Sequence, residues 1–181
     1  MRNVLSVAAT AFVATNVDDL FVLMLLFGQA RGKGARLRIT EGQFVGIGLL
    51  FAASAAAARG LGRVPEQYLR LLGLVPIVLG LRAWKNRGGQ EEEASATGVL
   101  STAMLTVANG GDNLGVYIPL FAGYTAGELA VTAAVFALLC GLWCLLGAKL
   151  ASLPRVREGI GRWKGILVPA VFILLGLSIL L

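Results

Sequence analysis

Long apolar stretches separated by short polar and basic segments dominate this sequence. Five of them cover residues 4–27, 41–58, 68–84, 98–122 and 128–150, and a sixth follows Lys164 and ends at Leu181. Most approach the ~20 residues that a helix needs to cross a bilayer. Backbone polar groups in lipid must be satisfied within the segment, so each stretch is expected to be a helix. The pattern predicts an all-α integral membrane protein with six transmembrane helices.

Composition supports the membrane class and excludes a soluble domain. Hydrophobic residues make up 57% of the 181 residues and charged residues 14%, whereas soluble domains contain about 25% charged residues. The net charge of +6 comes largely from basic residues between the apolar stretches, where they act as topology signals rather than as a nucleic-acid surface. We expect a multi-pass protein whose surroundings are the lipid bilayer, with no nucleic-acid partner. A homo-oligomer is compatible with this architecture.

Lys and Arg are distributed unequally between the two sides of the predicted bundle. The segments after the first, third and fifth stretches hold twelve of them, and the opposite side holds four. The positive-inside rule places the richer side in the cytoplasm and both termini outside it. Residues 86–97, polar and glycine-containing, are expected to form a solvated cytoplasmic linker between a first three-helix unit, 1–85, and a second, 98–181.

Two sequence features recur with the same separation of 93 positions. Asn16-x-x-Asp19 recurs as Asn109-x-x-Asp112, and a Leu-Val-Pro triplet in the third stretch recurs in the sixth. A unit of three spans has an odd number of crossings, so its second copy must be inverted in the membrane. Transporters built from inverted repeats bind substrate at the midplane, where the repeats meet. The sequence therefore predicts two inverted three-helix repeats whose Asn-x-x-Asp pairs face each other.

Acidic and carboxamide side chains lie in the middle of the first and fourth apolar stretches. Each Asp at bilayer depth costs roughly 2.5–3.5 kcal/mol on insertion scales, and no Lys or Arg deep in a stretch is placed to neutralise it. Residues three or four apart share a helix face, so each group is expected to point one way. Their oxygen atoms suit a divalent cation. We predict a metal site formed by Asn16, Asp18, Asp19, Asn109, Asp112 and Asn113.

Several of these features have structural alternatives. Asn side chains often hydrogen-bond between transmembrane helices without binding a ligand. Cys140 and Cys144, one turn apart, offer a soft dithiolate to a metal, but cysteines in apolar helices more often pack as small hydrophobes. The glycines at 110–111 are expected to weaken the fourth helix. Thr125-x-x-Glu128 predicts a capping box at the start of the fifth helix.

The polar clusters belong to longer signatures. These are Thr15-Asn16-Val-Asp18-Asp19, the stretch NGGDNLGVYIP at 109–119, and GQFVG at 42–46. They resemble the cadmium resistance transporter family (CadD-like) of the lysine-exporter superfamily. The resemblance implies a six-helix protein of the bacterial inner membrane that exports Cd²⁺ or other divalent ions, with the same Asn and Asp as functional residues. Cadmium follows only from this resemblance, because oxygen ligands suit Mn²⁺ or Ca²⁺ as well.

The chain contains no nucleotide-binding loop, so export must draw on an ion gradient. Moving a divalent cation out against ~100 mV costs about 4.6 kcal/mol. Protons and a metal ion that alternate on buried carboxylates would couple the two gradients. We therefore expect a secondary transporter that exchanges divalent cations for protons, and neither an enzyme nor a cofactor-dependent protein; the metal is its substrate.

Three other functions fit the same membrane class. An exporter of small amino acids or other organic solutes would need a buried base for the carboxylate, and the helices supply only acids. An intramembrane aspartyl protease is suggested by Gly110-Gly111-Asp112, but Asn109 stands where that motif needs glycine. A non-transporting assembly subunit would use the polar residues for packing. Stabilisation of the protein by divalent metals separates a metal transporter from all three.

Overall fold

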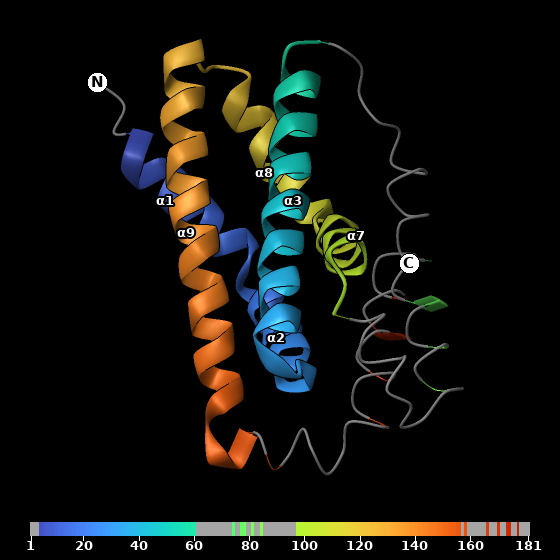
Figure 1. Cartoon of the computed structure of the whole chain (residues 1–181). Coiled ribbons are helices and arrows are strands. Elements are labelled where there is room, and N and C mark those ends of the chain that lie inside the picture. The colour runs from blue at the N-terminus through green and yellow to red at the C-terminus, as the bar shows by residue number, and fades with distance from the viewer. Residues whose placement is uncertain are drawn as a thin grey trace.

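The computed structural model describes residues 4–60, residues 97–156 and the single positions 74, 77, 78, 81, 84, 158, 166, 170, 173, 174 and 177. The two continuous ranges are helical, in agreement with the predicted all-α class (Figure 1). Their elements are α1 (Val4–Thr15), α2 (Val17–Gln29), α3 (Gly32–Ala58), α7 (Val99–Asn109), α8 (Gly111–Phe121) and α9 (Ala126–Ser152). Two short helices followed by one 27-residue helix therefore occur twice.

The first apolar stretch is broken at Asn16. α1 and α2 meet there at an angle of 59°, and Asn16 itself leaves helical geometry with ψ near 16°. Its side-chain N–H group donates to the Phe12 carbonyl oxygen at 2.8 Å, a local bond of the kind that competes with regular helix. The single continuous helix predicted over 4–27 is wrong, and with it the argument that Asn16 and Asp19 share one helix face.

The fourth stretch is broken at the predicted glycines. α7 ends at Asn109 and α8 begins at Gly111, with Gly110 between them. A Cβ atom at Gly110 would collide with the Leu50 side chain of α3. The glycine therefore lets the break approach α3 closely, in addition to loosening the helix.

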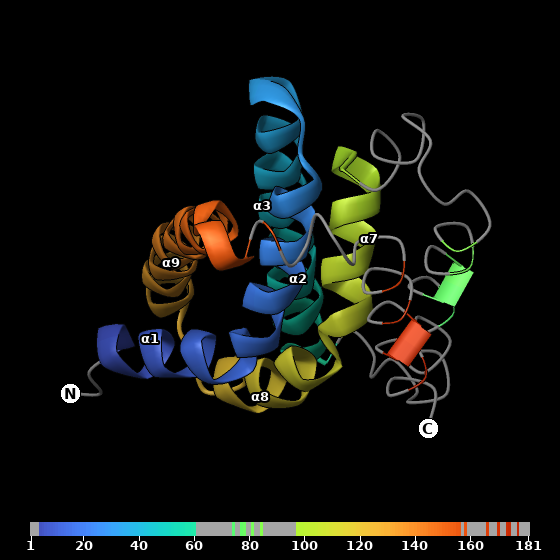
Figure 2. The same cartoon turned by 90° about the horizontal axis from the view of Figure 1, so that it is seen from below.

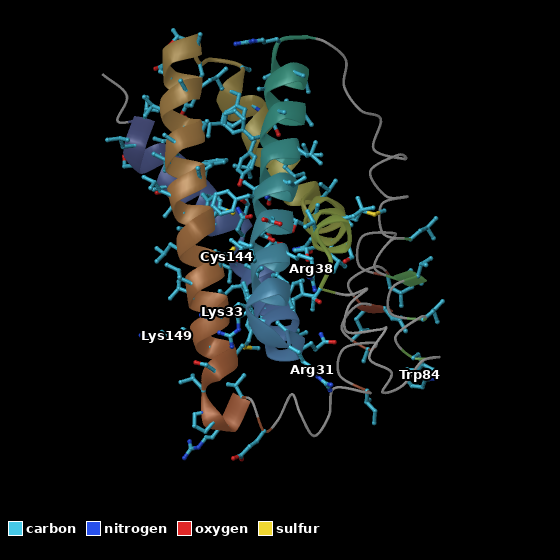
Figure 3. The ribbon with its side chains drawn as sticks, viewed as in Figure 1. Arg31, Lys33, Arg38, Trp84, Cys144 and Lys149 are labelled. Carbon is cyan, nitrogen blue, oxygen red and sulfur yellow. The ribbon has the colours of Figure 1, made fainter. Side chains whose placement is uncertain are left out.

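α3 and α9 form the long axis of the structure and run in opposite directions (Figure 1). α3 begins at Gly32, nine residues before the predicted start, so Lys33, Arg36 and Arg38 lie on its first turns and not in a loop. α9 begins at the predicted capping box: Thr125 accepts from the Glu128 backbone, and Glu128 accepts from the Thr125 backbone. Arg31, Lys33 and Lys149 lie toward the same end of the bundle (Figure 3).

Each long helix packs mainly against the two short helices of the other half of the chain. α3 packs against α7 and α8, whereas α9 packs against α1 and α2 (Figure 2). Gly42 and Gly46 of α3 meet Thr102 and Thr106 of α7 so closely that an added Cβ would lie 2.5–2.6 Å from the threonine Cβ atoms. Small residues four apart allow this close approach of helices in membranes.

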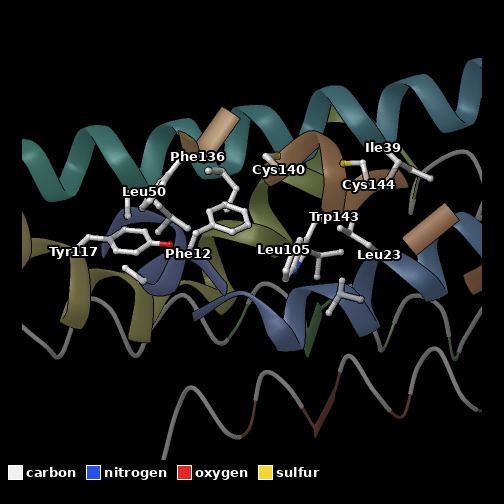
Figure 4. Packing of buried hydrophobic residues seen from close by; sticks show 14 of the residues in the cluster. Phe12, Leu23, Ile39, Leu50, Leu105, Tyr117, Phe136, Cys140, Trp143 and Cys144 are labelled. Atoms are coloured by element: carbon white, nitrogen blue, oxygen red, sulfur yellow. The ribbon is translucent and has the colours of Figure 1, made fainter. Parts of the chain in front are cut away.

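Aromatic rings fill the interior between the two halves. Phe12 packs edge-on against Phe136 and Trp143 (Figure 4), and Tyr117 stacks with Phe121. Large apolar side chains also cover the outside, as expected for a protein surrounded by lipid: Leu100, Leu138 and Leu145 are at least 70% exposed.

Within the described residues, two helices are long and apolar enough to span a membrane, or three if α1 and α2 together form one span. Of the predicted linker 86–97, only Thr97 lies within the described residues. Of the predicted third and sixth spans, only single positions do.

Candidate metal site

Two aspartates of one broken helix pair and one asparagine of the other converge where the two helix breaks meet. The side-chain N–H₂ group of Asn109, at the end of α7, donates to Asp18 Oδ2 at 2.7 Å and to Asp19 Oδ1 at 2.8 Å. This nitrogen lies between two carboxylates, where a bound cation would also be attracted. Rotating the amide by half a turn would present its oxygen as a ligand in the same place.

The local structure favours negative charge at this point. Asp18 and Asp19 lie in the first turn of α2, where the helix dipole stabilises carboxylates. Asp18 is exposed and accepts a hydrogen bond from the Asp19 backbone at 3.0 Å, whereas Asp19 is only 5% exposed. The pair thus connects an accessible carboxylate to a buried one.

Two further side chains position the buried carboxylate. Gln43 of α3 donates its side-chain N–H to Asp19 Oδ2 at 2.9 Å. The Thr106 hydroxyl donates to Gln43 Oε1 at 2.6 Å, which orients the amide so that its nitrogen faces Asp19. We call Asp18, Asp19, Gln43, Thr106 and Asn109 the carboxylate cluster.

A second, neutral group lies beside it at the break of the first helix pair. Asn16 is fully buried, and its N–H₂ group donates to the Tyr117 hydroxyl at 2.9 Å and to Thr15 Oγ1 at 3.0 Å. Its side-chain oxygen accepts from Asn113 at 3.3 Å, and its backbone carbonyl accepts the indole N–H of Trp143 at 2.6 Å. We call Thr15, Asn16, Asn113, Tyr117 and Trp143 the amide cluster. It connects the break at Asn16 to α8 and α9.

The predicted site residues divide between these two clusters. Asp18, Asp19 and Asn109 meet in the first, and Asn16 and Asn113 meet in the second. The backbone of Asp112 lies in the first turn of α8, and its side chain lies outside the described part of the chain. Within the described residues, no three Asp, Glu, Cys or His side chains are close enough together to hold a metal ion. The described ligands would therefore be two carboxylates supplemented by amide oxygens.

Sequence reasoning did not assign Gln43, Thr106, Tyr117 or Trp143 to the site. Gln43 and Tyr117 are part of the quoted signatures, and their position as hydrogen-bonding residues in apolar stretches is a signal that could have found them. Thr106 and Trp143 carry no comparable signal, because their roles depend on which helices pack together.

Comparison with known proteins gives one family. The family model for the cadmium resistance transporter matches residues 12–181, nearly the whole chain. No match was found among proteins of curated function or among solved structures.

Proposed function

The chain belongs to the cadmium resistance transporter family, and from this premise we propose that it exports divalent heavy-metal cations, chiefly Cd²⁺, from the bacterial cytoplasm in exchange for protons. The proposed path crosses the carboxylate cluster. The observation that carries the proposal is that Asn109 meets Asp18 and Asp19, which lie 91 and 90 positions before it and belong to the other broken helix pair.

The proposed cycle uses the two carboxylates alternately for metal and protons. Deprotonated Asp18 and Asp19 bind the ion with the rotated amide of Asn109, and protonation from the outside releases it. Two protons returned per divalent ion move no net charge, so the membrane potential, worth about 2.3 kcal/mol per charge at 100 mV, would not oppose export. Asn16, Asn113 and Asp112 are proposed to complete the site during the cycle.

The packing of each long helix against the other unit suggests how the site could open to the two sides of the membrane in turn. Each long helix contacts both short helices of the other unit, and the equivalent helices α3 and α9 run in opposite directions (Figure 1). The opposite directions of α3 and α9 support two inverted repeats, 1–85 and 98–181, which we propose to form a six-span bundle with both termini outside the cytoplasm. Rocking of one unit against the other about the breaks at Asn16 and Gly110 would open the cluster to each side in turn.

Metal-dependent stabilisation of the purified protein in detergent tests the proposed site. A ligand at 100 times its dissociation constant stabilises the folded state by about 2.7 kcal/mol, or roughly 5–11 °C in melting temperature for a protein of this size. We expect Cd²⁺ to produce this shift in the wild type and Asp19→Asn to lose most of it. Glu41→Gln, which neutralises an exposed acid elsewhere on α3, should keep the full shift.

Two results would contradict the proposal. One is a wild-type protein whose melting temperature no divalent cation raises. The other is an Asp19→Asn variant that Cd²⁺ stabilises as much as it does the wild type, which would place the metal away from the carboxylate cluster.

A further inference from the structure

Cys140 and Cys144 are the two cysteines of the chain, and the carboxylate cluster does not include them. They lie one turn apart on α9, are 1% and 4% exposed, and form no disulfide. At a spacing of four residues their thiols project from the same face of α9. Figure 4 shows both side chains in the packed interior together with Trp143.

The thiol pair has polar neighbours as well as apolar ones. Cys144 is within hydrogen-bonding reach of the Thr40 hydroxyl of α3. That hydroxyl donates to the Arg36 carbonyl oxygen at 3.1 Å, so it can accept from the thiol. Trp143 and Gly147 lie on either side of Cys144 along α9, and they contact Asn16 and Leu23, which lie on either side of Asp19. The thiol pair therefore lies on the part of α9 that packs along the segment carrying Asp19.

Thiolates and carboxylates prefer different metal ions. Carboxylate and amide oxygens bind Mn²⁺ and Ca²⁺ as readily as they bind softer ions, whereas thiolates select soft metals. Residues at i and i+4 on one helix face can hold a single metal ion between them. Two thiols at this spacing beside a carboxylate supply the soft ligands that the carboxylate cluster lacks.

We propose that Cys140 and Cys144 form a soft-metal station that binds Cd²⁺ as a dithiolate beside Asp19 and gives the transporter its preference for soft ions. This inference deepens the proposed function and rests on it. Each thiol loses its proton as a sulfur–metal bond forms, so one Cd²⁺ releases two protons and nothing is oxidised or reduced. In this structure Asp19 and the two sulfurs do not converge on one point, so the protein ligands of the station are the two thiolates.

Ultraviolet spectroscopy of the purified wild-type protein tests the station directly. Cadmium–thiolate bonds give a charge-transfer absorption that oxygen ligands do not, and only these two residues can supply thiolates. We expect one equivalent of Cd²⁺ to produce this band and Mn²⁺ to produce none. In the variant with both Cys140→Ser and Cys144→Ser, the band should vanish. The ratio of Cd²⁺ to Mn²⁺ affinity should fall by about tenfold or more, since losing even an outer-shell partner of a metal costs 10–100-fold.

The outcomes separate the station from the transport function. A wild-type protein that exports Cd²⁺ but shows no thiolate band retains the proposed function and overturns the station, as does a double-serine variant with unchanged metal preference. A band in a protein that moves no metal supports the station and contradicts the transport function. The wild-type spectrum decides the question even where the variant does not fold.

Discussion

Replacing Trp143 by Phe should destabilise the break between α1 and α2. The indole N–H donates at 2.6 Å to the backbone carbonyl of Asn16, a fully buried residue where the helix is interrupted. Leaving a buried acceptor without its donor costs about 1–3 kcal/mol, and the smaller ring leaves unfilled space worth about 1 kcal/mol. The edge-on contact with Phe12, at 5.5 Å between centroids, can be kept in part by the new ring. The expected loss is about 2–4 kcal/mol.

This loss is large enough to measure in detergent. At 2–4 °C per kcal/mol for a chain of this length, Trp143→Phe should lower the melting temperature by roughly 4–16 °C. Trp84→Phe is the matched control, because Trp84 is 48% exposed, and it should change the melting temperature by little. Equal melting temperatures for the two variants would refute the reasoning that the indole hydrogen bond holds the break.

Three further substitutions test other parts of the structure. Gly46→Ala places a Cβ 2.5 Å from a side-chain carbon of α7, and the overpacking should lower the free energy of unfolding by about 1–3 kcal/mol. In the control Gly48→Ala the added Cβ meets nothing within 4 Å, so thermal melts should show no destabilisation. Gln43→Leu removes a donor to the buried carboxylate and should weaken Cd²⁺ binding in calorimetry by about 10–100-fold; unchanged affinity, or an equal loss in Gln29→Leu, would contradict this role. Thr125→Ala removes the capping box and should lower stability by about 1 kcal/mol, which a denaturant titration would detect.

The sequence was sufficient to predict the all-α class and the positions of the two long helices α3 and α9. Hydrophobic runs located most of α3 and all but the ends of α9. The repeated motifs predicted that the two Asn-x-x-Asp pairs face each other, and Asn109 of one pair donates to Asp19 of the other at 2.8 Å. A carboxylate in the membrane interior is costly wherever it lies in the chain, so it needs a polar partner. The presence of such partners can therefore be predicted from the sequence.

Other features depend on tertiary contacts that hydropathy does not record. The break at Asn16 lies within a stretch whose overall hydropathy predicts one helix, and its buried backbone carbonyl accepts from Trp143, 127 positions away. Hydropathy predicts a later start for α3 because its first turns carry basic residues, which are also typical of loops but here lie on a helix end that extends beyond the apolar stretch. The signature containing Gln43 does not identify it as a site residue, since its role follows from the packing of α3 on α7.

Coupled transport in proteoliposomes tests the central claim most directly. The measurement follows Cd²⁺ movement and internal pH together, with wild-type protein and with Asp19→Asn in parallel vesicles. The account predicts that an imposed proton gradient drives Cd²⁺ in the opposite direction, that Cd²⁺ movement changes the internal pH, and that the folded Asp19→Asn protein does neither. Cd²⁺ transport without proton counterflow at any imposed gradient, or full transport by Asp19→Asn, would contradict it.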